Sequence, residues 1–209
     1  MLAATITQLR PQSEPPSRRE RLAGGNESDA ELVQRLRRGD MWAKEALYRR
    51  YVRTVSGLVL RLLGNSADAD DVVQDAFVLA LEDIDRLREA DRFGPWLVRI
   101  AVHQVHRRFR RRRLLRALGF TVGLEDATLD TLARSDCPPE VRAELGKVAR
   151  LLATLPPATR IAWMLRYVEG HSLEDAAGHA GCSLATLKRR VAAASHALRQ
   201  FVSFEEDLP

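Results

Sequence analysis

Apolar residues recur every three or four positions along most of the chain, which is the spacing of amphipathic helices, and no segment alternates as a half-buried strand does. Over residues 29–63 the pattern is interrupted at Gly39 and Asp40, which predicts two consecutive helices. A third helix is predicted over 68–87, because carboxylates cluster in its first turn, where the helix dipole favours negative charge. A fourth follows over 95–113, with a proline at its first position. We therefore expect an all-α protein.

The second half of the chain keeps this helical spacing. Two apolar stripes on either side of Pro156 and Pro157 predict two more helices. The stripes consist of Val141, Leu145, Val148, Leu152 and Leu155 in the first helix, and Ile161, Leu165 and Val168 in the second.

A helix-turn-helix is predicted after these two helices. Ser172 can cap a first short helix with Asp175 in the capping-box position, Gly181 supplies the turn, and Ser183 caps a second helix. An ordinary pair of helices in a bundle is the alternative interpretation. The second helix has an apolar side at helical spacing, formed by Leu187, Val191, Ala194 and Leu198. Its other side presents the residues that we predict to contact duplex DNA, namely Ser183, Thr186, Lys188, Arg189 and Arg190.

These elements predict two small helical domains joined by a flexible linker, the C-terminal one being the helix-turn-helix. Residues 1–28 are rich in Pro, Gly, Arg and Ser and are predicted to be a disordered leader. The first domain should span 29–113 and the second 140–202. A linker over 114–139 separates them, and an acidic tail over 203–209 follows.

The charge balance favours an anionic partner. The chain has 33 Lys and Arg against 28 Asp and Glu, a formal charge of +5, and its arginines are concentrated rather than spread. Nucleic acid is the expected partner and a membrane surface is the competitor. No apolar run approaches the roughly 20 residues of a membrane span, and the N-terminus lacks the apolar core of a signal peptide, so we expect a cytoplasmic protein. In that compartment Cys137 and Cys182 are expected to stay reduced.

The predicted helix over 95–113 has a second cluster of candidate binding residues. An aromatic side chain and several cations recur on its outer side, a combination suited to unpaired DNA, whose bases stack on aromatic rings. The alternative for Trp96 is a place in the core. Clustered arginines over 107–113 repel one another unless a polyanion relieves them. The candidates on this side, with one from the preceding loop, are Arg92, Trp96, Arg99, His103, His106, Arg107 and Arg110.

The predicted helix over 68–87 differs in being acidic on its outer side. Asp71, Gln74 and Asp75 form an acidic and amide face beside Phe77, which suits either protein docking or a solvated surface. Asp68, Asp70, Asp71 and Asp75 could alternatively be metal ligands of a nuclease, but no second carboxylate cluster accompanies them. The pairs His103 with His106 and His179 with Cys182 also lack further zinc ligands. We therefore predict no metal, no cofactor and no catalysis.

Two motifs resemble, in order and spacing, the extracytoplasmic-function (ECF) group of the sigma-70 family of bacterial transcription initiation factors. The first is DADDVVQDAF followed by FGPWLVRIAV and a basic helix end, and the second is LPPATRIAWMLRYVEGHSLEDAAGHAGCSLATLKRR. Together with the helices before them they cover about residues 29–202.

The resemblance implies an alternative sigma factor that binds core RNA polymerase and directs promoter-specific initiation. It implies that Asp71, Gln74, Asp75 and Phe77 dock on the polymerase. The helix from Trp96 and the loop before it would recognise and open the minus-ten element, and the helix-turn-helix would read the minus-thirty-five element. The linker would thread through the polymerase, and an anti-sigma protein is an expected partner.

Two departures from the family pattern bear on DNA contacts. His103 stands where many members have asparagine, and Ala192 and Ala193 replace longer side chains in the recognition helix. The remaining alternatives are a stand-alone helix-turn-helix regulator, which would need no polymerase, and a protein-interaction bundle.

Overall fold

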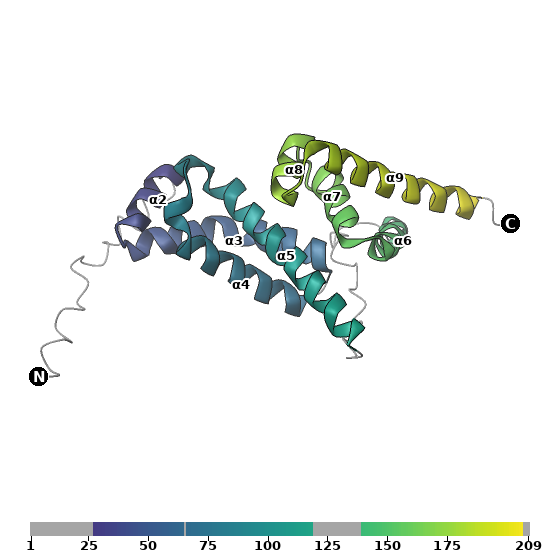
Figure 1. Ribbon diagram of the computed structural model, residues 1–209, viewed down its shortest axis with the longest axis horizontal. Coiled ribbons are helices and arrows are strands. Elements are labelled where there is room, and N and C mark those ends of the chain that lie inside the picture. Colours follow the sequence, from purple (N-terminus) through teal and green to yellow (C-terminus); the bar gives the residue numbers. More distant parts are fainter. Residues whose placement is uncertain (1–26, 65, 119–138, 207–209) are drawn as a thin grey trace, which may run out of the picture.

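The computed structural model describes residues 27–64, 66–118 and 139–206, and every regular element in these ranges is a helix. The helices form two groups, α2 to α5 and α6 to α9, which lie against each other in Figure 1. The all-α prediction is confirmed. Most of the predicted leader and linker lie outside the described residues, as does Cys137. None of the helices in the described ranges combines the length and apolar composition that a membrane crossing requires.

The first group consists of long helices joined by short turns. Its elements are α2 (Asp29–Arg37), α3 (Met41–Leu63), α4 (Ser66–Glu82), the 3-10 turns η2 (Ile84–Arg86) and η3 (Ala90–Arg92), and α5 (Phe93–Ala117). The two helices predicted over 29–63 are therefore present. The α5 helix continues beyond Arg113, where we predicted the first domain to end, while the limits of the domains as functional units stay a prediction.

Local hydrogen bonds explain where these helices begin. Ser28, which we placed in the leader, instead caps α2: its hydroxyl accepts from the Glu31 amide at 3.2 Å, and the Glu31 carboxylate accepts from the Ser28 amide at 2.8 Å. The Asp40 carboxylate caps α3 by accepting from the Trp42 amide at 2.9 Å. Gly64, with φ of 73°, ends α3 in the left-handed region.

The third predicted helix was too long, because α4 ends at Glu82 rather than near Leu87. The chain continues into η2, and a side chain of α2 donates hydrogen bonds to carbonyl groups of this turn. Arg37 of α2 donates to the carbonyl of Ile84 at 3.1 Å and also to that of Leu87. These bonds satisfy carbonyls that a continued helix would otherwise pair internally.

The second group begins with two helices that each start at a proline. Its elements are α6 (Pro139–Thr154), α7 (Pro157–Tyr167), α8 (Leu173–Ala180) and α9 (Leu184–Glu206). Proline suits the first helical position because it lacks the amide hydrogen that would be unpaired there. Val168, which we placed in the inward stripe, is 42% exposed because α7 ends before it.

One apolar core runs through both groups of helices without a break. In the first group α5 contributes Leu97, and in the second α7 contributes Ile161, both fully buried. Polar contacts cross the boundary as well. Arg61 of α3 forms a two-pronged ion pair with Glu169, with nitrogen–oxygen distances of 2.6 and 2.8 Å. The two groups thus form one packed body.

Candidate nucleic-acid interface

The helix-turn-helix has the hydrogen bonds that the sequence predicts. The Ser172 hydroxyl accepts from the Asp175 amide at 3.0 Å and begins α8. Gly181 ends α8 with φ of 62°, in the left-handed region that favours glycine. The Ser183 hydroxyl accepts from the Thr186 amide at 3.2 Å and begins α9. These caps set where α8 ends and α9 begins.

The recognition helix presents its cations to solvent as predicted, with one exception. Lys188 and Arg189 are exposed, while Leu187 on the opposite side is fully buried. Arg190 is only half-buried because it faces α5. The Thr186 hydroxyl accepts from Ser183 at 3.0 Å, so it also takes part in the cap. Two free cations therefore remain at the start of α9 for contact with a polyanion.

Helical spacing predicts Leu97, Ala101, Val105 and Phe109 on the inner side of α5. The first three are fully buried and Phe109 is half-buried, while Phe93 and Val102 are buried in addition. Trp96 is half-buried, with its ring centroid 6.1 Å from that of Phe93. The two interpretations of Trp96 are thus both partly satisfied: one side packs on the core, and the other lines a surface hollow.

Part of the predicted minus-ten set lies opposite the first helix of the helix-turn-helix. A hollow of about 450 Å³ lies between the first group of helices and α8. Arg92 of η3 lines one side with Trp96 and Arg99 of α5, and Glu174 and His179 of α8 line the other. One end of the candidate surface of the first domain therefore lies opposite the second domain, although Arg92 and Arg99 remain exposed.

The two α5 histidines lie at this boundary. The His103 Nε2 atom is 3.0 Å from the position that a Cβ would take on Gly181, although the rest of the imidazole is exposed. His106 is half-buried, and its Nε2 atom has no hydrogen-bond partner. Burial, reinforced by the charge of neighbouring cations, lowers the pKa of His106 to about 4. Its imidazole is therefore neutral over the usual pH range.

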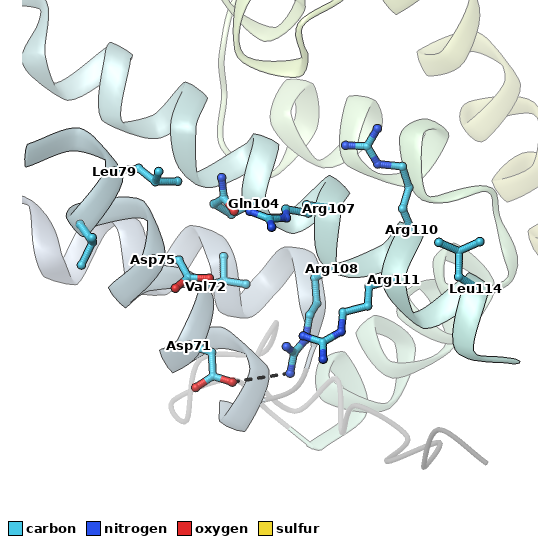
Figure 2. Close-up of a pocket in the computed structure, with 11 residues that line it drawn as sticks. Asp71, Val72, Asp75, Leu79, Gln104, Arg107, Arg108, Arg110, Arg111 and Leu114 are labelled. Atoms are coloured by element: carbon cyan, nitrogen blue, oxygen red, sulfur yellow. Dashed lines mark ion pairs between the residues drawn. The ribbon is translucent and has the colours of Figure 1, made fainter. Parts of the chain in front are cut away.

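A second hollow separates α4 from α5 and has walls of opposite charge. It measures about 820 Å³, and Figure 2 shows Asp71 and Asp75 on the α4 side. Arginines of α5 line the other side, and Asp71 pairs with Arg108 at 3.6 Å. Asp71, Asp75 and Gln74 are exposed, as the predicted docking face requires.

Phe77 does not share that exposed face. It is 5% exposed and packs on Tyr48, with ring centroids 4.8 Å apart. Any contact with a partner would reach it only through the apolar hollow that it lines beside Met41 and Tyr48.

The arginine run is partly neutralised from within, contrary to our expectation that a polyanion must relieve it. Asp68 is 7% exposed and pairs with both Arg108 and Arg112. These arginines recur one turn apart on α5, so one carboxylate reaches both. Arg107 and Arg110 remain exposed, whereas Arg108 and Arg112 hold α5 against the start of α4.

The residues that join the two groups of helices have no signal in the local sequence. Arg160 of α7 lies with its guanidinium 4.6 Å from the centre of the Phe109 ring and donates to the Leu62 carbonyl at 3.0 Å. Burial lowers the pKa of Arg160 to about 10. Arg61 and Glu169 are separated by more than a hundred positions in sequence, and no local pattern indicates such a pairing. In the described ranges, no three His, Cys, Asp or Glu side chains are arranged to hold a metal ion.

Comparison with known families matches both halves of the chain. Residues 47–114 match the family described as sigma-70 region 2, and residues 145–198 match that described as sigma-70, region 4. The RNA polymerase sigma-H factor of Pseudomonas aeruginosa is 32% identical over 179 residues, which cover 82% of this chain and 92% of that protein. The ECF RNA polymerase sigma-E factor of Haemophilus influenzae is 31% identical, covering 78% and 89% of the two chains.

Solved structures share the fold. CnrH in complex with the cytosolic domain of CnrY superimposes with a TM-score of 0.58 at 24% identity, covering 87% of this chain and all of that one. The sigma factor RpoE in complex with the anti-sigma factor NepR, from Bartonella quintana, gives a TM-score of 0.57 at 21% identity, covering 76% and 96%.

Proposed function

Since the chain belongs to the ECF group of the sigma-70 family, and so is an alternative sigma factor directing promoter-specific transcription initiation, we propose how its surfaces divide that work. The helix-turn-helix binds the upstream promoter element as duplex. The η3 turn and α5 bind the minus-ten element and hold it open. The outer face of α4 docks on core RNA polymerase.

The observation that carries the upstream assignment is the pair of free cations on a capped recognition helix. Lys188 and Arg189 are exposed on the first turns of α9, whose opposite side is locked into the core by Leu187. In a helix-turn-helix these are the turns that enter the major groove. Ser183 and Thr186 lie beside them. Arg190 also contacts the DNA when its side chain turns away from α5.

For the minus-ten element, the support is an aromatic ring beside cations on one exposed helix side. Trp96 offers a ring face, and Arg99 and Arg107 are exposed along the same helix. Unpaired bases stack on aromatic rings, and arginines follow the phosphates. Arg92, His103, His106 and Arg110 complete this surface, which we call the minus-ten face.

The polymerase-docking assignment rests on charge and exposure. Asp71, Gln74 and Asp75 form an outer face of α4 that cannot bind DNA because of its negative charge. Phe77 supports this face from below. We propose that the protein has no catalytic activity of its own, that it acts in the bacterial cytoplasm, and that an anti-sigma protein restrains it, as NepR is bound to the similar RpoE.

The test of this division is transcription by core polymerase on paired templates, one with an intact upstream element and one with that element scrambled. The variant Lys188→Ala with Arg189→Ala should lose the preference for the intact element, because each base contact contributes roughly 1–3 kcal/mol. A matched control removes two exposed arginines of the same domain, Arg150→Ala with Arg199→Ala. It should keep the preference.

Polymerase association is measured in parallel by native gel. The recognition-helix variant should bind core polymerase as the unaltered protein does, whereas Gln74→Ala with Asp75→Asn should bind weakly. Glu82→Gln, at the other end of α4, controls for loss of negative charge. Weak core binding by the recognition-helix variant would contradict the division of labour.

A further inference from the structure

The histidines of this protein gather where the two groups of helices meet. Of the five in the chain, His103 and His106 lie on the boundary side of α5, and His179 lies on α8. His171 joins them, with its ring centroid 4.7 Å from that of His179. The fifth, His196, is exposed on α9.

His106 is surrounded by positive or potentially positive groups. Those acting on it are His103 and Arg110 from α5 and Arg190 from α9, and no carboxylate offsets them. Its buried Nε2 atom has no partner that could share a proton. A charged imidazole at this position would therefore be repelled from both helices.

His179 is in a comparable environment on the other side of the boundary. It is 8% exposed, and His171, Arg99 of α5 and the Asp175 carboxylate act on it. Burial, together with His171 and Arg99, outweighs the carboxylate and lowers the pKa of His179 to about 4. Since Arg99 belongs to the other group of helices, closing the boundary adds to this effect.

We propose that these histidines form a proton-sensitive latch: the two domains stay closed while His106 and His179 are neutral, and protonation of either favours separation. The closed arrangement places one end of the minus-ten face opposite α8, because Trp96 and Arg99 line a hollow whose other wall is α8. The latch itself stands on this geometry. Its consequence for promoter reading rests on the proposed function.

Other contacts hold the domains closed when the histidines are neutral. The ion pair of Arg61 with Glu169 and the bond from Arg160 to the Leu62 carbonyl both cross the boundary. Carboxyl and guanidinium groups ordinarily titrate at about pH 4 and above about pH 12, outside the range from pH 6.5 to 5. Any opening between pH 6.5 and 5 is therefore attributable to the histidines.

The sign and size of the effect follow from linkage. Each of these histidines has a pKa of about 6.5 in the open form and about 4 in the closed form. Closure is therefore fully favoured above pH 6.5, and it is progressively disfavoured as the pH falls from 6.5 towards 4. At pH 5.5 each such histidine shifts the equilibrium about tenfold towards the open form. The two together shift it about 100-fold.

The experiment measures the radius of gyration of the full chain by small-angle scattering from pH 8 to pH 5 at constant ionic strength. Circular dichroism at each pH verifies that the helices persist. The unaltered protein should expand between pH 6.5 and 5, and so should His196→Gln. The variant His106→Gln with His179→Gln should stay compact at pH 5.5. Expansion of that variant at the same pH as the unaltered protein, or no expansion of the unaltered protein, would overturn the proposal.

A second measurement does not depend on substituting buried histidines. Imidazole NMR signals report the pKa of each histidine, and Glu169→Gln weakens closure without touching them. The pKa of His106 and His179 should rise towards 6.5 in that variant, while that of His196 should not change. Unchanged values for His106 and His179 would refute the latch. If the protein opens with acid but shows no promoter selectivity, the latch stands and only the proposed function is refuted.

Discussion

Removing the Asp68 carboxylate should destabilise the first group of helices more than any exposed ion pair could. Asp68 pairs with Arg108 and Arg112, and the three side chains are 10%, 27% and 19% exposed. Breaking a buried pair leaves an uncompensated charge and typically costs about 3–5 kcal/mol. Because these arginines keep some contact with water, we expect Asp68→Ala to lower the free energy of unfolding by about 2–3 kcal/mol.

The assay is urea unfolding followed by tryptophan fluorescence, arranged as a double-mutant cycle. Asp68→Ala, Arg112→Ala and the double variant should give a coupling energy above roughly 1 kcal/mol. The matched control is the exposed pair Glu45 and Arg49 of α3, which are 56% and 77% exposed and should couple by about 0.3 kcal/mol. Equal coupling in the two cycles would refute the argument that Asp68 is a structural clamp.

The same substitution has a consequence for DNA. With Asp68 removed, Arg108 and Arg112 each lose the carboxylate that neutralises them, beside the arginines already exposed on α5. Non-specific DNA binding by Asp68→Ala should therefore become more salt-dependent, by roughly 0.9 in slope for each additional phosphate contact. Titrations at several salt concentrations measure this slope. An unchanged slope would mean that these arginines cannot reach a polyanion.

Three further substitutions test local geometry. Gly94→Ala places a Cβ 2.7 Å from the Tyr51 ring, so the ring must move, and thermal unfolding should detect a loss of about 1–3 kcal/mol. Ser172→Ala removes the α8 cap and should cost about 1 kcal/mol, whereas Ser172→Thr should retain most of the stability. Gly181→Ala forces a left-handed backbone at about 1–2 kcal/mol and also crowds His103, so His103→Ala should recover only the steric part. Stability equal to that of the unaltered protein in any of these would contradict the corresponding geometry.

Features governed by neighbours in sequence were predictable. The caps at Ser172 and Ser183 and the break at Asp40 depend on hydrogen bonds across two or three residues, and all are present. The buried face of α5 follows from helical spacing in the same way. The end of α4 was misplaced because a distant side chain, Arg37, holds the turn that replaces its last residues.

The candidate site was predictable in composition but not in arrangement. Charge and periodicity identified Lys188 and Arg189, and both are exposed. They could not indicate that Asp68 would neutralise two of the arginines, or that Arg190 would face His106. Those relations depend on how α5 packs against α4 and against the second group of helices, and no local pattern in the sequence encodes these contacts.

The 25-residue α5 helix, about 37 Å long at roughly 1.5 Å per residue, carries several tasks on one rigid rod. Trp96 and Arg99 belong to the proposed DNA surface, His106 to the boundary with the second group of helices, and Arg112 to the clamp with Asp68. Because the helix is continuous between these positions, a shift at one of them is transmitted to the others, and they cannot evolve independently. A substitution that retunes base preference in one turn will alter domain closure in the next, so we expect adaptive changes in α5 to appear as compensating pairs.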